Sequence, residues 1–391
     1  MKYNFDKVID RSGTSAEKVE GLKHIWGRTD LIPLWVADMD FATAPFVTDA
    51  IRKRCENEVL GYTGKPDSYY NAIINWVKQR YDLIVTKEVI NFVPGIVPGI
   101  GMAMNCFTQK GDKVMIQPPV YHPFAWVTTR NERTLVINPL RWENGMYRMD
   151  LDAFREQIKG CKLFILCNPH NPGGVVWTEV ELRAIADICY DEKVLVFSDE
   201  IHADLTLPPH THRPFATVSE KARMNSVTFM SPSKAFNMPG LSASHALIFN
   251  EDLRKRFRIY MDAGELDMGH VFAFLSVEAA YSHGTEWLDQ CLAYIQGNID
   301  FVDEFLKKHA PKIKAIRPEA SYLVWLDCRE LELSQKDLNE FFVDKAHLAL
   351  NDGEMFGKEG IGFMRLNVAS PRCIIEKAMK QLADAYQLYI K

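Results

Sequence analysis

The sequence predicts an α/β protein in which a large domain with a mostly parallel sheet is joined to a smaller α+β domain. Three observations lead to this prediction. The 391 residues are too many for one simple core, so a second domain is expected. The middle of the chain alternates short apolar runs with helical patterns, which is typical of parallel strands covered by helices. The carboxyl-terminal part then mixes helices and strands in another order.

Six apolar runs predict the strands of the large sheet. They are KVMIQ (113–117), TLVIN (134–138), KLFIL (162–166), VLVF (194–197), SVTFM (226–230) and ASHALIF (243–249). Residues 178–193 carry apolar residues at helical spacing and acidic residues in the first turn, which predicts a helix between two strands. Residues 89–109 are uncharged, but their prolines, glycines and asparagines favour a buried turn that enters a helix over a membrane span.

The carboxyl-terminal part predicts a separate small domain. Its expected helices are 293–310 and 336–350, its expected strands are 321–328 and 363–369, and a final amphipathic helix follows. The amino-terminal part is expected to complete this domain. The predicted boundaries are 1–45 for an amino-terminal arm and part of the small domain, 46–282 for the large domain and 283–391 for the small domain.

Composition excludes several classes of function. The net charge of −5 argues against nucleic acid as a partner, because phosphate binding needs a concentrated basic surface. The eight cysteines are scattered without framework spacing, so reduced thiols are expected. The amino terminus lacks the apolar core of a signal peptide, which predicts a cytoplasmic protein without a membrane partner. His210 and His212 lack a third ligand, so no metal site is expected.

Polar side chains follow four of the predicted strands, at the edge where open α/β sheets bind their ligands. They are Tyr121 after 113–117, Asn171 after 162–166, Asp199 and His202 after 194–197, and Ser231, Ser233 and Lys234 after 226–230. The glycine-rich turn at 95–104 opens a helix and is suited to present backbone N–H groups to a phosphate.

Together these groups match the needs of a pyridoxal phosphate site. Such a site uses a lysine that forms a Schiff base, a carboxylate at the ring nitrogen, a stacking ring and a phosphate cradle. Each group also has an ordinary structural alternative: a surface residue for Lys234, a helix cap for Asp199, a turn residue for Asn171 and a core ring for Tyr121. Independent structural causes would not readily place all four at strand ends, which favours the cofactor site.

The set of motifs resembles that of a known family. The motifs are PLWVADMDF (33–41), LGYTG (60–64), PPVYHPF (118–124), NPHNPGG (168–174), SDEIHADL (198–205), SPSKAFNMPGL (231–241) and MRLNVASPR (364–372). They look like those of the fold-type I pyridoxal phosphate enzymes and, more narrowly, of the aminotransferase-like C–S lyases of the MalY/PatB (cystathionine β-lyase) family. The resemblance runs in order along nearly the whole chain.

The resemblance implies that pyridoxal 5′-phosphate is the cofactor and that Lys234, Asp199 and Tyr121 are catalytic. Lys234 would carry the cofactor and remove the Cα proton, Asp199 would pair with the ring nitrogen, and Tyr121 would stack on the ring. The remaining implied cofactor contacts are Asn171 and His202 near the ring oxygen, and the backbone of Ile96 and Val97 with the hydroxyls of Ser231 and Ser233 at the phosphate.

The resemblance also implies a homodimer with shared active sites. Tyr62 would reach the phosphate of the neighbouring subunit, and Arg365 would bind the carboxylate of an amino-acid substrate. The implied reaction is α,β-elimination from cysteine-type amino acids such as cystathionine, as in cystathionine β-lyases and cysteine desulfhydrases. It yields pyruvate, ammonia and a thiol.

Two positions depart from typical aminotransferases and favour the lyase branch. His202 stands where those enzymes carry a tyrosine, and Ser242 stands where they carry a phosphate-binding arginine. The segment 11–27 differs from the Lys-Trp pattern common in this branch, which leaves the substrate open. Two alternatives remain: an aminotransferase that uses a 2-oxo acid, and a regulatory protein-binding module that retains the cofactor.

Overall fold

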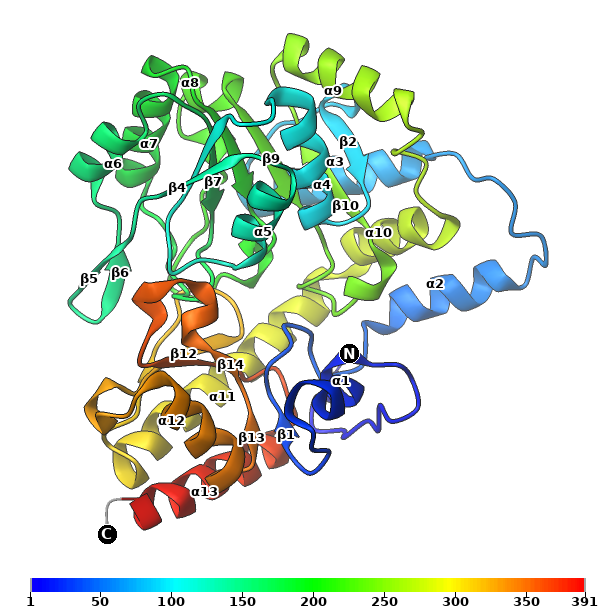
Figure 1. Cartoon of the computed structure of the whole chain (residues 1–391). Coiled ribbons are helices and arrows are strands. Elements are labelled where there is room, and N and C mark those ends of the chain that lie inside the picture. The colour runs from blue at the N-terminus through cyan, green and yellow to red at the C-terminus, as the bar shows by residue number, and fades with distance from the viewer. Residues whose placement is uncertain (1, 390–391) are drawn as a thin grey trace.

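The computed structural model describes residues 2–389 and is built around a seven-stranded sheet (Figure 1). In spatial order the strands are β2 (Ile90–Val93), β10 (Ser244–Leu247), β9 (Ser226–Met230), β8 (Leu195–Asp199), β7 (Cys161–Cys167), β3 (Lys113–Ile116) and β4 (Thr134–Ile137). Strand β10 runs antiparallel to both of its neighbours, and the pairs from β9 to β4 are parallel. The predicted mostly parallel sheet is therefore confirmed.

Helices cover both faces of this sheet. Val196 and Phe197 are neighbours in β8, and they enter different apolar clusters because successive strand residues point to opposite faces. The cluster with Phe197 includes residues of α4 (Ile96–Phe107), α5 (Pro123–Arg130) and α9 (Glu251–Ala263). The cluster with Val196 includes residues of α6 (Leu151–Gln157), α7 (Glu179–Asp191) and α8 (Glu220–Met224). A capping box between Thr178 and Glu181 sets the start of α7.

A second sheet belongs to the carboxyl-terminal part of the chain. Its antiparallel order is β11 (Lys314–Ile316), β12 (Leu323–Asp327), β15 (Phe363–Asn367) and β14 (Asn351–Asp352). The helices near it are α11 (Thr285–His309), α12 (Gln335–Glu340) and α13 (Arg372–Tyr389). Strand β1 (Ile32–Pro33) pairs in parallel with β13 (Leu348–Ala349), so the amino-terminal segment reaches this part of the molecule.

Four further α-helices and a hairpin belong to the described residues 2–389. Helix α10 (Val271–His283) packs against α2 (Pro45–Cys55) and α3 (Asp67–Tyr81), and α1 (Glu17–Trp26) lies in the amino-terminal arm. The hairpin joins β5 (Arg141–Glu143) to β6 (Met146–Arg148). The loop between α2 and α3 extends away from the body of the molecule (Figure 1).

Two predicted elements differ from the structure. The helix expected at 336–350 ends early, since a π-helical turn at Phe341–Lys345 is followed by His347 with φ of 53° and then by β13. The helix expected at 293–310 begins earlier, at Thr285. Residues 89–109 form strand β2 and helix α4, and among residues 2–389 no helix has the length and apolar character to cross a membrane. The eight cysteines are free thiols, as their spacing predicts.

Candidate active site

A cavity of about 260 Å³ lies beyond the carboxyl ends of β7, β8 and β9. Residues that the sequence analysis selected from distant segments line it together: Ile96, Val97, Tyr121, Asn171, Asp199, His202, Ser233 and Lys234. They meet there because the carboxyl ends of parallel strands share one edge of the sheet. Among the selected residues, Tyr62, Ser231 and Arg365 do not line this cavity.

Lys234 lies in the turn after β9, and its ammonium nitrogen is 2.5 Å from the backbone oxygen of Ala37. Within the described chain it forms no ion pair with a carboxylate. Burial, with a smaller effect of the nearby Arg365 charge, lowers the pKa of the Lys234 amine to about 8, against weaker opposing effects of Asp38 and Asp199. A substantial fraction of neutral amine is therefore present near neutral pH, as a nucleophile or base requires.

Asp199 is the last residue of β8 and is 3% exposed. One carboxylate oxygen accepts a hydrogen bond from the backbone N–H of Ile201 at 3.1 Å. Burial raises the pKa of this carboxyl to about 7, although the Ile201 N–H and the Lys234 charge act in the opposite direction. A carboxyl group in this state becomes firmly ionised once a cationic group enters the cavity beside it.

His202 and Tyr121 supply the ring systems of the cavity. Burial lowers the pKa of His202 to about 3, so this imidazole is neutral, and its Nδ1 has no hydrogen-bond partner among the described residues. Tyr121 follows β3 and its ring packs edge-on against Phe124, with 5.8 Å between ring centroids. An unpaired buried nitrogen next to an aromatic wall is suited to a planar polar ligand.

The amino terminus of α4 forms one end of the cavity. Gly95 precedes the helix with φ of 110°, a conformation that favours glycine, and Ile96 and Val97 follow as the first helical residues. Their N–H groups have no earlier turn of helix to bond to, so this end attracts anions. Ser233 also lines the cavity, whereas the hydroxyl of Ser231 donates to the carbonyl of Ala243 and accepts from the Ser233 N–H.

Arg365 reaches the edge of the site from β15 and is 3% exposed. Its Nη1 donates to Oδ1 of Asn171 at 3.0 Å, which joins the small sheet to the large one. Its Nη2 donates to Oδ1 of Asn351 at 2.5 Å and to the carbonyl of Trp35 at 3.2 Å. Burial lowers the pKa of Arg365 to about 10, so the guanidinium stays charged at neutral pH.

The family model for aminotransferase class I and II matches residues 29–382. The chain belongs to this family. Cystathionine beta-lyase PatB of Bacillus subtilis (strain 168) is 38% identical over 384 residues, which cover 98% of this chain and 99% of the relative. The crystal structure of cystalysin from Treponema denticola, which contains pyridoxal 5′-phosphate, matches with a TM-score of 0.96, 33% identity and full coverage of both chains. The PLP-bound C–S lyase of Staphylococcus hominis matches with a TM-score of 0.91 and 35% identity over 98% of each chain.

These comparisons confirm the fold-type I architecture expected for an aminotransferase class I and II chain. Sequence reasoning missed two contributors to the site of this family member. The carbonyl of Ala37 accepts hydrogen bonds from Lys234 and from the hydroxyl of Tyr322, and Asn351 holds Arg365. The motif PLWVADMDF pointed to the segment of Ala37, but a backbone acceptor has no side-chain signature.

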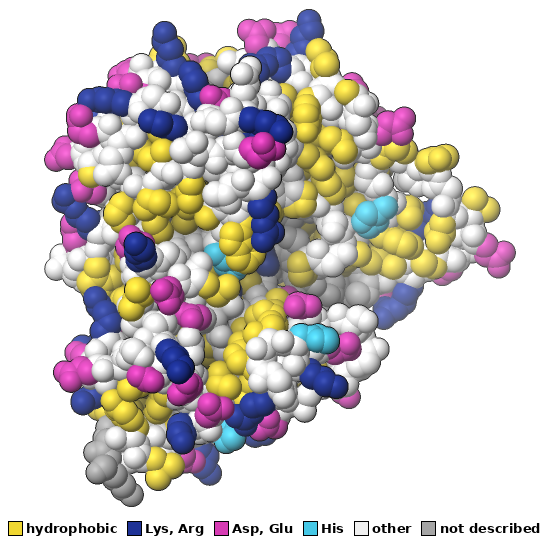
Figure 2. Space-filling model, in the orientation of Figure 1, with side chains coloured by type: hydrophobic (Ala, Val, Ile, Leu, Met, Phe, Trp, Pro, Cys, Tyr) yellow, Lys and Arg dark blue, Asp and Glu magenta, His cyan; other side chains and the backbone are white. Residues whose placement is uncertain are grey.

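Tyr62 lies outside the cavity, in the extended loop between α2 and α3. Its side chain is 99% exposed, and Val59 and Leu60 beside it are 72% and 59% exposed. Figure 2 shows hydrophobic side chains along this protruding loop. Such exposure of consecutive apolar side chains is typical of a surface that meets another protein.

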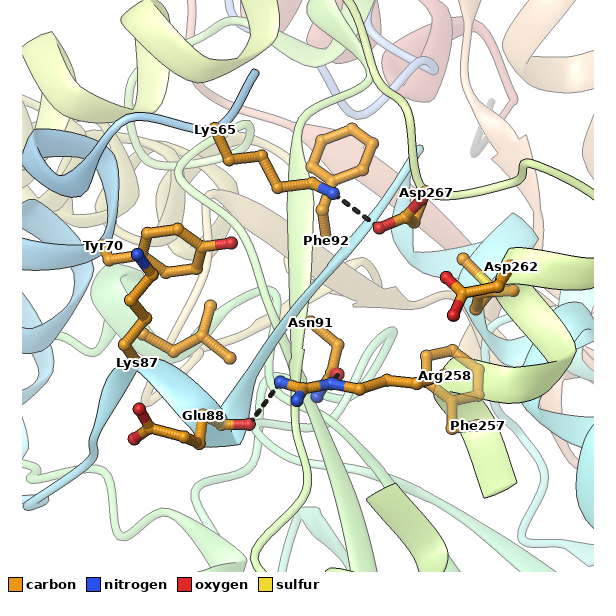
Figure 3. A pocket seen from close by; sticks show the side chains of 12 residues that line it. Lys65, Tyr70, Lys87, Glu88, Asn91, Phe92, Phe257, Arg258, Asp262 and Asp267 are labelled. Atoms are coloured by element: carbon orange, nitrogen blue, oxygen red, sulfur yellow. Dashed lines mark hydrogen bonds and ion pairs between the residues drawn. The ribbon is translucent and has the colours of Figure 1, made fainter. Parts of the chain in front are cut away.

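A second cavity, of about 350 Å³, lies beside edge strand β2 (Figure 3). Its cations already have partners: Lys65 pairs with Asp267 at 2.5 Å, and Nη2 of Arg258 donates to the Glu88 carbonyl at 2.6 Å. Lys87 likewise pairs with Asp67. Because both lysines of this second cavity are ion-paired, and because the first cavity gathers the residues selected from the sequence, we assign the active site to the first cavity.

Proposed function

We propose that this chain is a pyridoxal phosphate-dependent carbon–sulfur β-lyase. It releases a thiol, pyruvate and ammonia from cysteine-type amino acids. The observation that carries the proposal is the meeting of Lys234 and Asp199 in one cavity, with Arg365 bonded to Asn171 of the cavity wall. The chain is also 38% identical to a cystathionine beta-lyase over nearly its whole length. The lysine, carboxylate and carboxylate-binding arginine are the groups that this chemistry needs.

The cavity residues fit the cofactor. Lys234 has no carboxylate partner and would carry the aldehyde carbon, while the buried carboxyl of Asp199 would meet the protonated ring nitrogen. Asn171 and the unpaired nitrogen of His202 lie at the same cavity for the polar ring substituent, and Tyr121 would cover the ring. The amino terminus of α4, with Ser233, would hold the phosphate.

The reaction then divides among three side chains. Arg365 binds and orients the substrate carboxylate, which fixes the Cα–H bond relative to the ring plane. Lys234, whose amine is partly neutral near pH 7, takes the Cα proton at Nζ. Bound pyridoxal phosphate supplies a ring system that accepts the electron pair left on Cα. Asp199 would stabilise the positive ring nitrogen, and the thiolate would leave from Cβ with its bonding electrons and take a proton from Nζ of Lys234. Water would then hydrolyse the released enamine to pyruvate and ammonia.

The proposal also covers a homodimer. The apolar side chains of the loop between α2 and α3 are exposed in this chain, which supports contact with a second copy. In that arrangement Tyr62 would bond the cofactor phosphate of the neighbouring subunit.

The deciding experiment supplies purified protein and cofactor with cystathionine and measures pyruvate, ammonia and homocysteine. We expect equal amounts of the three products without any added 2-oxo acid, and little net reaction with alanine, which has no leaving group at Cβ. A reaction that stops after one turnover until a 2-oxo acid is added would identify an aminotransferase and refute the lyase.

A further inference from the structure

Neutral oxygen atoms hold the guanidinium of Arg365. The three acceptors are Oδ1 of Asn171, Oδ1 of Asn351 and the backbone oxygen of Trp35. Among residues 2–389, no carboxylate lies within ion-pair distance of this arginine, although it is almost fully buried. A buried arginine is normally paired with an acid, so its surroundings keep a positive charge available to a ligand.

The register of the small sheet fixes the place of Asn351. In the antiparallel pair of β14 and β15, Asn351 lies directly opposite Arg365, so both side chains emerge on the same face. A guanidinium has donors only, so the amide atom 2.5 Å from Nη2 must be the oxygen. The amide nitrogen is then directed to the sulfur of Met355 at 3.5 Å.

The choice of an amide over an acid at this position has a physical consequence. An aspartate would occupy the same volume and accept the same hydrogen bond, but it would form an ion pair with Arg365 and compete with any incoming carboxylate. An amide oxygen orients the guanidinium and leaves its charge unneutralised. The ring of Phe356, 4.8 Å from the guanidinium carbon, also contacts the cation without cancelling its charge.

We propose that Asn351 is a positioning residue for substrate recognition, which orients Arg365 and leaves its positive charge to the substrate carboxylate. This inference rests on the proposed function, in which Arg365 binds that carboxylate. A purely structural Asn351, which only ties β14 to the turn at Met355, would affect all ligands equally. A positioning residue affects only ligands that carry a carboxylate.

The test compares the affinities of alanine and ethylamine, which share an amine and differ by the carboxylate. Both are titrated by calorimetry into cofactor-loaded wild type, Asn351→Ala and Asn351→Asp. We expect Asn351→Ala to lower the affinity for alanine about 10-fold, the typical effect of losing one hydrogen bond to a charged group. For Asn351→Asp we expect the affinity for alanine to fall about 100-fold, because the new acid also neutralises the charge of Arg365. The affinity for ethylamine should change less than about 2-fold in either variant.

Asn339→Ala is the matched control, because Asn339 donates to Asp352 at 2.6 Å in the same part of the fold without contacting Arg365. It should leave both affinities unchanged. Equal weakening of alanine and ethylamine in the Asn351 variants, or wild-type binding of alanine by Asn351→Asp, would overturn the inference. If the Asn351 variants bind alanine more weakly as expected, but the wild type releases no pyruvate from cystathionine, the proposed lyase activity is refuted and the role of Asn351 stands.

Discussion

Lys18 is buried and Lys234 is half-buried, and their partners differ. Lys18 is fully buried, and its ammonium nitrogen lies 2.8 Å from a carboxylate oxygen of Asp40 and 3.7 Å from one of Asp38. Among residues 2–389, the ammonium of Lys234 has a hydrogen bond only to the carbonyl of Ala37. A carboxylate stabilises an ammonium far better than a carbonyl does, so Lys18 is suited to an ion pair and Lys234 to proton transfer.

The pKa of Lys234 gives a first prediction. In the cofactor-free protein, acylation of this amine should rise with pH around a midpoint near 8, below the ordinary lysine value of 10.5, because burial disfavours the ammonium. Arg365→Gln removes a repelling charge and should move the midpoint upward. Competitive labelling followed by peptide mass spectrometry measures both, and an ordinary midpoint in the wild type would contradict the assignment.

Asp199→Asn gives a second prediction. Turnover should fall on the order of 10²-fold or more, since one preorganised electrostatic partner of the ring is lost. Cofactor retention should change much less, because Lys234 and the amino terminus of α4 remain. Steady-state rates and dialysis of the loaded protein separate the two effects, and near-normal turnover would reduce Asp199 to a cap for the Ile201 N–H.

The lysine itself gives a third prediction. Lys234→Ala should abolish turnover and the visible absorbance of the bound cofactor, because no other base or nucleophile of this kind lines the described cavity. Borohydride reduction and peptide mapping provide the check. A cofactor adduct on another lysine of the variant would show that the anchor is elsewhere.

At the residue level, sequence reasoning finds groups whose chemistry is local. That Lys234 and Asp199 lie at one cavity could be predicted, because Asp199 ends one recognisable strand and Lys234 follows another. Asn351 could not, since its importance comes from a register with Arg365 that only the folded sheet creates. Ser231 shows a further limit: its hydroxyl lies near the site but is occupied by the Ala243 carbonyl.

At the scale of elements, the extended segment from Trp35 to Asp38 connects the parts of the site. Its carbonyls accept hydrogen bonds from Lys234 in the large sheet region and from Arg365 and Asn367 in the small sheet. The arm that contains α1 then holds this segment through the ion pairs of Arg11 and Lys18 with Asp38. The geometry of the site therefore depends on an element that lines little of the cavity.

That arrangement predicts the effect of Lys18→Met. The change leaves Asp38 and Asp40 with Arg11 as their only ion-pair partner among residues 2–389, and the free energy of unfolding should fall by about 2–3 kcal/mol. The loss of stability is smaller than for a fully buried ion pair, because both aspartates are partly exposed to solvent. Urea denaturation measures the loss, and Lys23→Met on the exposed side of the same helix is the control. Equal stabilities of the two variants would contradict this role of Lys18.

The strands of the large sheet could be predicted from sequence because their apolar runs are bounded by turn residues. The prediction of one helix over 336–350 was wrong, because the apolar residues of the buried two-residue strand β13 continue the pattern of the preceding helix. Only the pairing of Leu348 and Ala349 with β1, more than 300 positions earlier, makes them a strand.

At the scale of the whole molecule, the proposed dimer predicts complementation. Tyr62→Ala would damage the neighbour's cofactor site and Arg365→Ala its own substrate site, so each variant alone should be nearly inactive. Refolding the two together should restore activity, since one site of each mixed dimer keeps both residues. The assay is pyruvate release, with each variant refolded alone as the control and differently sized tags to confirm exchange. A mixture no more active than the mean of the two controls would exclude sharing.

The separation of Lys234 and Arg365 along the chain has a consequence for biosynthesis. The ribosome releases Asp199 in β8 and Lys234 in the turn after β9 well before β15, which contains Arg365. Amino-terminal parts of a chain generally fold first. A nascent chain can thus gather the groups proposed to face the cofactor ring while Arg365, the proposed binder of the substrate carboxylate, is still absent. The order of translation would then separate cofactor loading from substrate recognition, and a growing polypeptide would hold no complete catalyst until its small sheet closes.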